Sequence, residues 1–302
     1  MKVITVIVTY NGTRWIEKCL QNIVNQCEVI VVDNNSTDNT VELITKKFPQ
    51  VQILLQDKNW GFGVANNIGI SHALKLGADA VFLLNQDAYA QEKCIENLIT
   101  VCEKNPEYGI ISPVHLNGDG TALDYTFQKI TYMSNIISDL IFKNESDLMY
   151  ENTFVNAAAW LLPKKTLLTV GGFDPLFFLY GEDDNYCQRV LYHGLKIGIT
   201  TKSVIFHDSK NDNYQGGTIG SDKYYRQFIN GLNVVYADVN KQMSNKIYRL
   251  KLHMIKKILI NILQLKFKDV SILIKKIKLI DSKAIKNSVV INSKPHHNYL
   301  EF

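Results

Sequence analysis

The chain has 302 residues, 46% of them hydrophobic and 10% aromatic, with only six prolines, which is enough for one large domain with an appendage and excludes a disordered chain. The formal net charge of +4 is spread unevenly, because residues 241–302 hold 14 Lys or Arg and three acids, a net charge of +11, whereas residues 1–240 have a net charge of −7. The sequence therefore divides into an acidic part and a basic tail. We expect no nucleic-acid partner.

No run of 18 or more uncharged apolar residues occurs, so no membrane-spanning helix is predicted. Residues 1–8 resemble a signal peptide only superficially, because they hold one basic residue and the apolar run ends at Thr9, Tyr10 and Asn11 without a cleavage site. We interpret them as a buried strand. The five cysteines form no CxxC pair, which indicates free thiols in a reducing cytoplasm.

Residues 1–114 alternate between strand patterns and helix patterns. Apolar β-branched runs predict strands, and apolar residues at three- and four-residue spacings predict one-sided helices. The predicted strands are 2–9, 28–33, 51–55, 80–84 and 109–113. The predicted helices begin near Ile16, after the capping candidates Ser36, Thr37 and Asp38, after the glycine-rich loop at 59–63, and near Glu92. This repetition predicts a mostly parallel sheet with helices on both faces.

The alternation fades between residues 115 and 155, where we expect β-hairpins and loops. The later predicted elements are a strand at 154–162, a short helix after Pro163, a helix at 182–193, a strand at 196–206, and helical segments at 221–240 and 246–280. We therefore predict an α/β fold in which residues 1–240 form one domain with halves 1–114 and 115–240. Residues 241–302 would be a basic helical extension.

Polar residues follow three predicted strands, at the edge where parallel sheets bind ligands. Asp33 could accept a hydrogen bond from a base N–H or a ribose hydroxyl, and the alternative is an ordinary Asx turn or helix cap. Asp87, in Asn85-Gln86-Asp87, could hold Mg²⁺ or Mn²⁺ against a diphosphate, because these cations prefer oxygen ligands. A turn with a helix cap is again the alternative.

Residues 59–69 form a glycine- and asparagine-rich segment that opens a helix. Its glycines permit close approach of a ligand, and a helix N-terminus near Gly63 favours an anion such as pyrophosphate. The GxGxxG fingerprint is absent. A flexible loop before a helix is the alternative.

The densest acidic cluster is Glu182, Asp183 and Asp184, at a predicted helix start after four apolar or aromatic residues. The helix N-terminal field favours an ionised carboxylate, as a general base requires, whereas the alternative is a solvated helix end. His207 ends a predicted strand and could complete a metal site with Asp87, although a lone histidine is usually structural.

Together and in this order, these segments resemble the family 2 glycosyltransferases of the GT-A fold, in particular the rhamnosyltransferase-like and galactofuranosyltransferase-like branch, over residues 1–240. The resemblance implies catalytic roles for Asp183, the base, and Glu182. It implies metal ligands at Asp87 and His207, and acceptor-binding residues at Trp160, Tyr180 and Asp184. The implied nucleotide-sugar-binding residues are Thr9, Tyr10, Asn11, Asp33, Asn35, Asn59, Gly61, Phe62, Gly63, Asn66, Asn67, Asn85 and Gln86. Two positions depart from the family pattern: Asn85 replaces the first acid of the DxD motif, and Asn185 stands where an acid is common.

The resemblance implies an inverting transfer of a sugar from a UDP- or dTDP-sugar to a saccharide or lipid-linked saccharide acceptor, with Mg²⁺ or Mn²⁺, in cell-surface polysaccharide biosynthesis. One alternative is a non-catalytic scaffold of the same fold in a polysaccharide-assembly complex, favoured by Asn85 and opposed by the retained Asp87, Asp183 and His207. A nucleotidyltransferase is a second alternative, but it would need a glycine-rich basic loop after the first strand, where residues 10–13 are Tyr-Asn-Gly-Thr.

The tail at 246–280 places apolar residues at helical spacings among lysines and arginine. A basic amphipathic helix can lie in the interface of an anionic membrane. The alternative is a helical hairpin that packs on the catalytic domain and keeps a solvated basic face. We predict a cytoplasmic protein with peripheral, salt-sensitive association with the inner face of the cytoplasmic membrane through residues 241–290.

Overall fold

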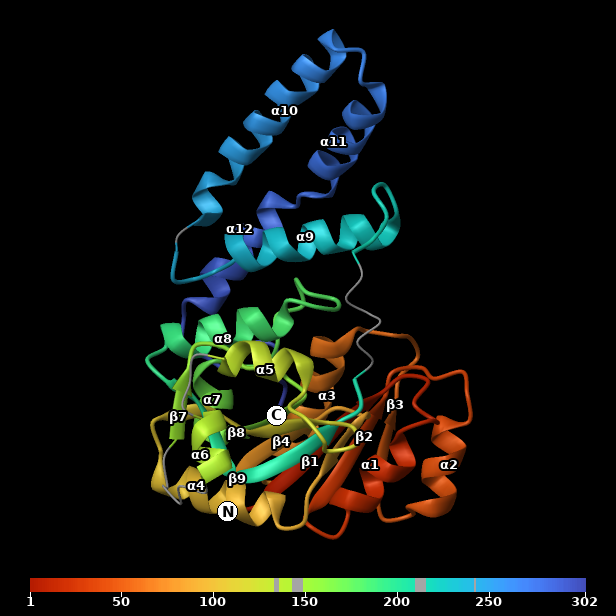
Figure 1. Cartoon of the computed structure of the whole chain (residues 1–302), viewed down its shortest axis with the longest axis vertical. Coiled ribbons are helices and arrows are strands. Elements are labelled where there is room, and N and C mark those ends of the chain that lie inside the picture. Colours follow the sequence, from red (N-terminus) through yellow and green to blue (C-terminus); the bar gives the residue numbers. More distant parts are fainter. Residues whose placement is uncertain (133–135, 143–148, 210–215, 242) are drawn as a thin grey trace.

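A computed structural model describes residues 1–132, 136–142, 149–209, 216–241 and 243–302. The described residues form one nine-stranded sheet with helices on both faces, and a group of C-terminal helices stands above one end of this body (Figure 1). The strand order is β3-β2-β1-β4-β8-β6-β9-β5, and β7 pairs with β9. None of the described helices is long and apolar enough to cross a bilayer.

The first four strands are parallel, as the alternating pattern predicted. They are β1 (Val3–Thr9), β2 (Glu28–Asp33), β3 (Gln52–Leu55) and β4 (Ala80–Leu84). The helices between and after them are α1 (Ile16–Ile23), α2 (Thr40–Lys47), α3 (Phe62–Lys75) and α4 (Cys94–Lys104). Thr9 lies opposite Asp33 in the register of β1 and β2, so the polar residues after these strands meet at one edge.

The second half of the sheet is mixed, which corrects the prediction of a mostly parallel sheet. Its strands are β5 (Ala88–Ala90), β6 (Tyr108–Asn117), β7 (Met149–Asn152), β8 (Ala159–Pro163) and β9 (Lys196–His207). β8 is antiparallel to both of its neighbours, β4 and β6, whereas β6 and β9 are parallel. The parallel prediction holds for β1–β4, which local strand–helix repeats connect, and fails where β5, β7 and β8 join the sheet.

The expectation of hairpins and loops between residues 115 and 155 is wrong for two parts of that segment, which are helical. They are the helices α5 (Tyr125–Thr131) and α6 (Ile136–Phe142). The side chain of Asp124 starts α5, because it accepts hydrogen bonds from the N–H groups of Thr126 and Phe127. Residues 133–135 and 143–148 lie outside the described part of the chain.

Both faces of the sheet are buried by apolar clusters. Because side chains alternate along a strand, Ile4 and Val6 of β1 enter one cluster while Val3 and Ile7 enter the other. The first cluster also holds Trp160 and packs against α8 (Glu182–Tyr192), and α7 (Lys164–Thr169) contributes Leu167 to it. The strand ends are therefore the places where polar side chains can gather.

The C-terminal region contains α9 (Asp222–Tyr236), a 3-10 turn (Met243–Lys246), α10 (Ile247–Leu263), α11 (Phe267–Leu279) and α12 (Ser282–Asn292). α10 and α11 form a hairpin that projects from the body, and the chain then returns to the body (Figure 1). Leu300 joins the core of the first half, and the Asn298 carbonyl accepts a hydrogen bond from the Gly172 N–H at 2.8 Å. The predicted extension thus includes a segment that packs on the body.

Candidate functional site

The end of β2 is held by hydrogen bonds to Asp33, whose side chain is only 3% exposed. Its Oδ1 accepts from the hydroxyls of Thr9 at 2.9 Å and Ser36 at 2.6 Å, and its Oδ2 accepts from the Ser36 N–H at 2.9 Å. Asn11 joins the same turn, because its Oδ1 accepts from the Thr37 N–H at 2.8 Å. Asn35 is exposed and left-handed, with φ +66. Asp33 therefore fixes the turn that follows β2. Its Oδ2 accepts one hydrogen bond from the described residues.

The ends of β1 and β4 are joined by Gln86. Its amide accepts from the Tyr10 N–H at 3.1 Å and donates to the Tyr10 carbonyl at 3.3 Å. A Cβ at Gly12 would lie 2.2 Å from the Gln86 Oε1, so this clamp requires glycine there. The clamp holds the Tyr10 backbone while leaving its ring 46% exposed at the edge of the sheet.

The glycines of the 59–69 segment make room for protein, which differs from the expectation that they make room for a ligand. A Cβ at Gly61 would lie 2.1 Å from the Phe178 carbonyl oxygen, and one at Gly63 would lie 2.8 Å from the Phe173 Cβ. The Phe62 N–H, expected to face a pyrophosphate, donates to the Phe178 carbonyl at 3.1 Å. The start of α3 is thus packed against the loop before α8.

The asparagines of the same segment are also engaged within the chain. Asn59 Oδ1 accepts from the Gly61 N–H and from Asn34 Nδ2, each at 2.9 Å, and Asn66 Nδ2 donates to the Phe62 carbonyl at 2.9 Å. The Asn67 amide bonds both the N–H and the carbonyl of Phe173, at 2.7 and 2.8 Å. Asn67 thus clamps α3 to the loop that precedes α8, whereas Asn59 and Asn66 bond groups near their own segment, and the contact of all three with a nucleotide sugar stays a prediction.

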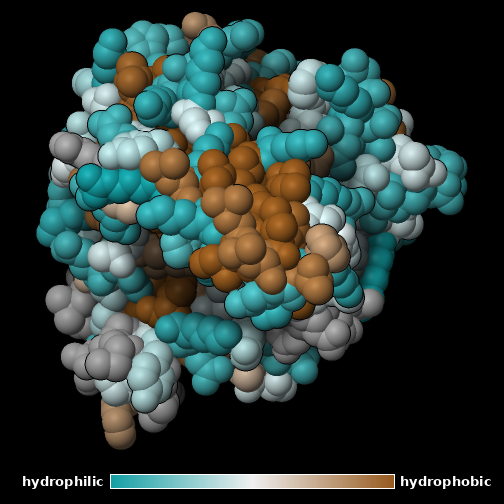
Figure 2. Space-filling view, turned by 90° about the horizontal axis from the view of Figure 1, so that it is seen from above, coloured by the Kyte–Doolittle hydropathy of each residue, from teal (hydrophilic) through white to brown (hydrophobic). Residues whose placement is uncertain are grey.

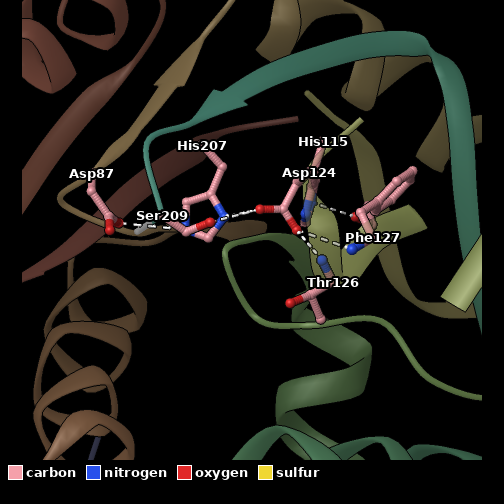
Figure 3. Close-up of polar contacts among 8 residues, drawn as sticks. Asp87, His115, Asp124, Thr126, Phe127, His207 and Ser209 are labelled. Atoms are coloured by element: carbon pink, nitrogen blue, oxygen red, sulfur yellow. Dashed lines mark hydrogen bonds and ion pairs between the residues drawn. The ribbon is translucent and has the colours of Figure 1, made fainter. Parts of the chain in front are cut away.

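Asp87 and His207, 120 residues apart in sequence, lie side by side as predicted for a metal pair. The antiparallel pairing of β5 and β9 sets Ala88 opposite His207, and the Asp208 N–H donates to the Asp87 carbonyl at 2.9 Å. His207 Nε2 then lies 3.5 Å from Asp87 Oδ1. Figure 3 shows His207 between two carboxylates, Asp87 on one side and Asp124 on the other.

Asp124 is the residue of this site that sequence reasoning missed. It is 2% exposed, and its Oδ2 lies 3.3 Å from His207 Nδ1 and accepts from the Ser209 hydroxyl at 2.8 Å. Although burial opposes it, these bonds hold the pKa of Asp124 well below its ordinary value. Likewise, burial opposes but the bonds to Asp124 and Asp87 raise the pKa of His207 to about 9. An Asx cap could be predicted at Asp124 from its sequence neighbours, but its contact with His207 could not.

This pair of donors fits a divalent cation that is shared with a diphosphate. Within the described residues no group of three or more His, Cys, Asp or Glu could hold a metal ion, and the candidate ligands are Asp87 and His207. Mg²⁺ is commonly bound by one or two carboxylates together with substrate phosphates and water. A histidine ligand ordinarily donates its second ring nitrogen to a carboxylate, as His207 can to Asp124. In addition, the Asn85 Oδ1 is buried without a partner among the described residues.

The acidic cluster begins α8, after the left-handed residues Tyr180 and Gly181. Burial, with the Asp183 charge beside it, raises the pKa of Glu182 to about 8. Burial, with Asp184 beside it, raises the pKa of Asp183 to about 6. We expected the helix field to keep these carboxylates ionised; at neutral pH this holds for Asp183, whereas burial keeps Glu182 protonated. Asp183 is half-buried as a residue.

A two-residue segment connects this cluster to the metal edge. The Ala157 backbone N–H hydrogen-bonds Asp183, and the Ala158 carbonyl accepts from the Asn85 N–H at 2.9 Å. The acidic edge and the Asn85–Asp87 edge are therefore neighbours across the start of β8. The arrangement combines a carboxylate with a pKa near neutrality and a cation site, which is suited to proton abstraction beside a charged leaving group.

The three predicted acceptor-binding residues lie in different environments. Trp160 is completely buried and stacks on Phe173, with ring centroids 6.0 Å apart, and its contact with an acceptor stays a prediction. Tyr180 is 63% exposed, next to the exposed Phe178 and Leu179. Asp184 is half-buried, and burial raises its pKa. An exposed aromatic strip thus leads to the acidic cluster.

The turn at Gly171–Asp174 is held from behind by α12, which sequence reasoning did not foresee. Asp174 is 4% exposed and accepts from the Ser288 hydroxyl and from Asn292 Nδ2, each at 2.6 Å. Arg189 is fully buried and donates to the Gly172 carbonyl at 2.6 Å and to Asn292 Oδ1 at 3.2 Å. α12 therefore supports the loop that precedes the acidic cluster at the start of α8.

Comparison with known proteins agrees with this architecture. The model of glycosyl transferase family 2 matches residues 4–167. The dTDP-rhamnosyl transferase RfbF of Shigella flexneri is 24% identical over 204 residues, covering 67% of this chain and 67% of that protein. The N-acetylglucosaminyl-diphospho-decaprenol L-rhamnosyltransferase of Mycobacterium tuberculosis is 24% identical over 229 residues, covering 67% of this chain and 75% of that protein. Galactofuranosyltransferases are also among the relatives.

Among solved structures, that of GalNAc-T7 with UDP, GalNAc and Mn²⁺ superimposes with a TM-score of 0.57 at 14% identity, covering 78% of this chain and 48% of that chain. This similarity confirms the predicted GT-A fold. The family match spans more than half of the chain, and its relatives include the rhamnosyltransferase and galactofuranosyltransferase branch that the motifs resembled. The chain belongs to glycosyl transferase family 2 and is a glycosyltransferase.

Proposed function

We propose that this enzyme transfers a sugar, with inversion, from a UDP- or dTDP-sugar to a saccharide or lipid-linked saccharide in cell-surface polysaccharide biosynthesis. The observation that carries the proposal is Asp183, a half-buried carboxylate whose pKa is raised to about 6, beside the edge that holds Asn85 and Asp87. A carboxylate with a pKa near the working pH can both be ionised and accept a proton efficiently.

In the proposed reaction, Asp183 takes the proton of an acceptor hydroxyl while that oxygen attacks the anomeric carbon. The bond from this carbon to the diphosphate oxygen breaks on the opposite face, which inverts the configuration. Asp87 and His207 would hold Mg²⁺ or Mn²⁺, which when bound neutralises charge on the diphosphate. Asp124 orients the His207 ring through the contact of its carboxylate with the Nδ1 of His207.

The donor base and ribose would meet the ends of β1 and β2. The exposed Tyr10 ring offers a flat apolar surface for a base, and Asp33 Oδ2 has one described partner. The uridine or deoxythymidine preference is supported by two names: one relative is a dTDP-rhamnosyl transferase, and the GalNAc-T7 structure contains UDP. The same structure contains Mn²⁺, which supports the proposed cofactor.

The acceptor would approach along Phe178, Leu179 and Tyr180, which are 51%, 41% and 63% exposed. Aromatic and apolar side chains suit a sugar face or a lipid portion. The name of the mycobacterial relative describes a lipid-linked acceptor, which supports this substrate class. Such acceptors are found at membranes, so we place the enzyme in the cytoplasm, peripheral to the inner face of the membrane.

The rival proposal is a non-catalytic scaffold of the same fold, and Asn85 remains the feature that favours it. Two measurements on the purified protein separate the possibilities. Slow Mn²⁺-dependent hydrolysis of the correct donor is expected of the enzyme and not of the scaffold. Thermal-shift screening of nucleotides with Mn²⁺ is expected to show stabilisation by UDP or dTDP, and stabilisation by GDP alone would contradict the base assignment.

A further inference from the structure

The hairpin of α10 and α11 has a packed base and an uncovered far end. At the base, Ile247 and Met254 are 2% and 5% exposed and pack with Leu232, Ile280 and Ile285. Beyond Met254, many apolar side chains face solvent. We call the following residues the hairpin tip: Ile255, Leu259, Ile260, Ile262, Leu263, Leu265, Phe267 and Ile274, which are 40–85% exposed. An apolar helix face is ordinarily buried, and no described part of the chain buries this one.

The hairpin tip lies at the end of the molecule that projects furthest from the body (Figure 1). Figure 2 looks down on this end and shows a continuous hydrophobic area with hydrophilic side chains around it. Monomeric proteins rarely leave large contiguous apolar areas in water, and such areas mark contacts with a partner or a membrane.

Leu265 gives independent support, because folding does not explain it. It follows α10 in a left-handed conformation, with φ +56, and the next N–H, of Lys266, donates back to the Asn261 carbonyl at 2.8 Å. Glycine or asparagine is ordinary at this helix-ending position, since a larger side chain is strained there. Leu265 is nevertheless 74% exposed, so it gains little burial in return for its strain. A contact outside the chain would account for it.

The charges around the tip identify the partner. Residues 247–279 hold nine Lys or Arg and one acid, and Lys256, Lys257, Lys266 and Lys268 are exposed near the tip. A second copy of this chain would bring like charges together, whereas an anionic surface would be attracted. We propose that the hairpin tip inserts into the interface of an anionic lipid bilayer, with these lysines at the headgroups, and does not cross it.

The segments that follow the hairpin pack on the body, and this determines which variants can test membrane insertion. α12 and residues 298–301 hold the turn at Gly172 and Asp174, so deleting residue 241 onward would damage the body as well as remove the tip. Substitutions at exposed positions avoid this problem. Leu263, Leu265 and Phe267 are 85%, 74% and 63% exposed, so their polar replacement should leave the fold intact.

The experiment is co-sedimentation of the full chain with phosphatidylcholine vesicles, with and without phosphatidylglycerol, at low and high salt. Wild type should bind the anionic vesicles at low salt and bind them weakly at high salt. The triple variant Leu263→Ser, Leu265→Asn, Phe267→Ser should bind at least about tenfold more weakly. Lys266→Gln with Lys268→Gln should weaken binding about fivefold per lysine. Leu168→Ser, at a 42% exposed leucine of α7, is the matched control and should bind as wild type does.

Leu265→Asn alone sharpens the test, because it should weaken vesicle binding while leaving the melting temperature unchanged or higher. Absence of wild-type binding at low salt, equal binding to neutral vesicles, or full binding by the triple variant would overturn the proposal. So would a wild-type dimer in sedimentation velocity that the triple variant dissociates, without any vesicle binding. Donor hydrolysis needs no bilayer, so an inactive chain that still binds vesicles would contradict the proposed reaction and leave the membrane surface standing.

Discussion

The donor edge at the ends of β1, β2 and β4 and the acidic edge at the start of α8 both bury carboxyl groups, but in opposite states. Asp33 is 3% exposed and accepts three hydrogen bonds. Glu182 is 6% exposed, its Oε2 has no partner among the described residues, and its pKa is raised to about 8. A satisfied buried carboxylate fixes geometry, whereas burial that raises carboxyl pKa values marks a candidate reactive cluster. Within that cluster, a pKa of about 8 favours protonated Glu182, and a pKa of about 6 leaves Asp183 as the base.

The substitution Asp183→Asn is expected to have the largest effect on the reaction, and it tests the assignment of the base at the acidic edge. Removing a positioned base should lower the turnover rate by about 10²–10⁴-fold, while the affinity for UDP or dTDP, measured by calorimetry, stays near that of wild type. Glu182→Gln is the matched control. Because its raised pKa keeps Glu182 protonated at neutral pH, a neutral amide should change the rate by only a few fold. A fully active Asp183→Asn enzyme would refute the assignment.

Asp124→Asn tests a satisfied carboxylate that positions a ligand. The amide can still cap α5, but it can present an N–H to His207 and so disturb the ring that faces Asp87. We expect the affinity for Mn²⁺ in the presence of UDP, measured by electron paramagnetic resonance, to fall about 10–100-fold. Ser209→Ala removes a different bond to the same carboxylate and should have little effect on Mn²⁺. Unchanged Mn²⁺ affinity in Asp124→Asn would show that His207 needs no such support.

The pH dependence of the reaction rate tests the acidic edge without any mutation. Asp183 must be ionised to act as a base, and its raised pKa of about 6 means that the rate should rise as pH increases through 6. At pH 5 about a tenth of the enzyme would have an ionised base, so kcat/KM should be about tenfold below its value at pH 8. Melting temperatures at each pH provide the control for unfolding. A rate that is flat from pH 5 to 7 would exclude Asp183 as the titrating base.

Asn67→Ala should have the smallest effect on the reaction and a clear effect on folding. It leaves the buried N–H and carbonyl of Phe173 without partners, which should lower the free energy of unfolding by about 2–4 kcal/mol in urea denaturation. Asn25→Ala, at an exposed asparagine outside the left-handed region, is the control and should change stability by less than about 0.5 kcal/mol. If Asn67→Ala instead abolished UDP binding in a stable protein, the 59–69 segment would be a nucleotide site after all.

Sequence reasoning succeeded where structure depends on local pattern. The strands ending at Thr9, Asp33 and Leu84 were predicted to the residue at those ends, because each is a continuous apolar run followed by polar residues. The proximity of Asp87 and His207 was predicted from their residue types at strand ends and from the resemblance, and not from any predicted strand pairing. Nothing in the local sequence indicates that β5 and β9 pair.

The site predictions that differ from the structure share a physical cause. Segments distant in sequence hydrogen-bond the polar side chains that were expected to bind a ligand. The amide of Asn67 looked available to a ligand, but Phe173 occupies it from 106 residues away. Asp174 is bound by α12 from 118 residues away through Asn292, a contact that no local pattern around residue 174 indicates. A single sequence shows the positions of polar groups along the chain, but it does not show which group each of them hydrogen-bonds in the folded protein.

The last residues of the chain carry a consequence for how the protein is made. The Glu301 N–H donates to the Ser71 hydroxyl at 3.0 Å, and the Asn298 carbonyl accepts from Gly172, so the end of the chain completes a core built from its beginning. These contacts cannot form until residues 298–301 have left the ribosome. The sheet of the first half can assemble earlier during synthesis, but the loop that precedes the acidic cluster gains this support only after residues 298–301 emerge. A chain that stops before residue 298 should therefore be a substrate for proteases instead of a slow enzyme.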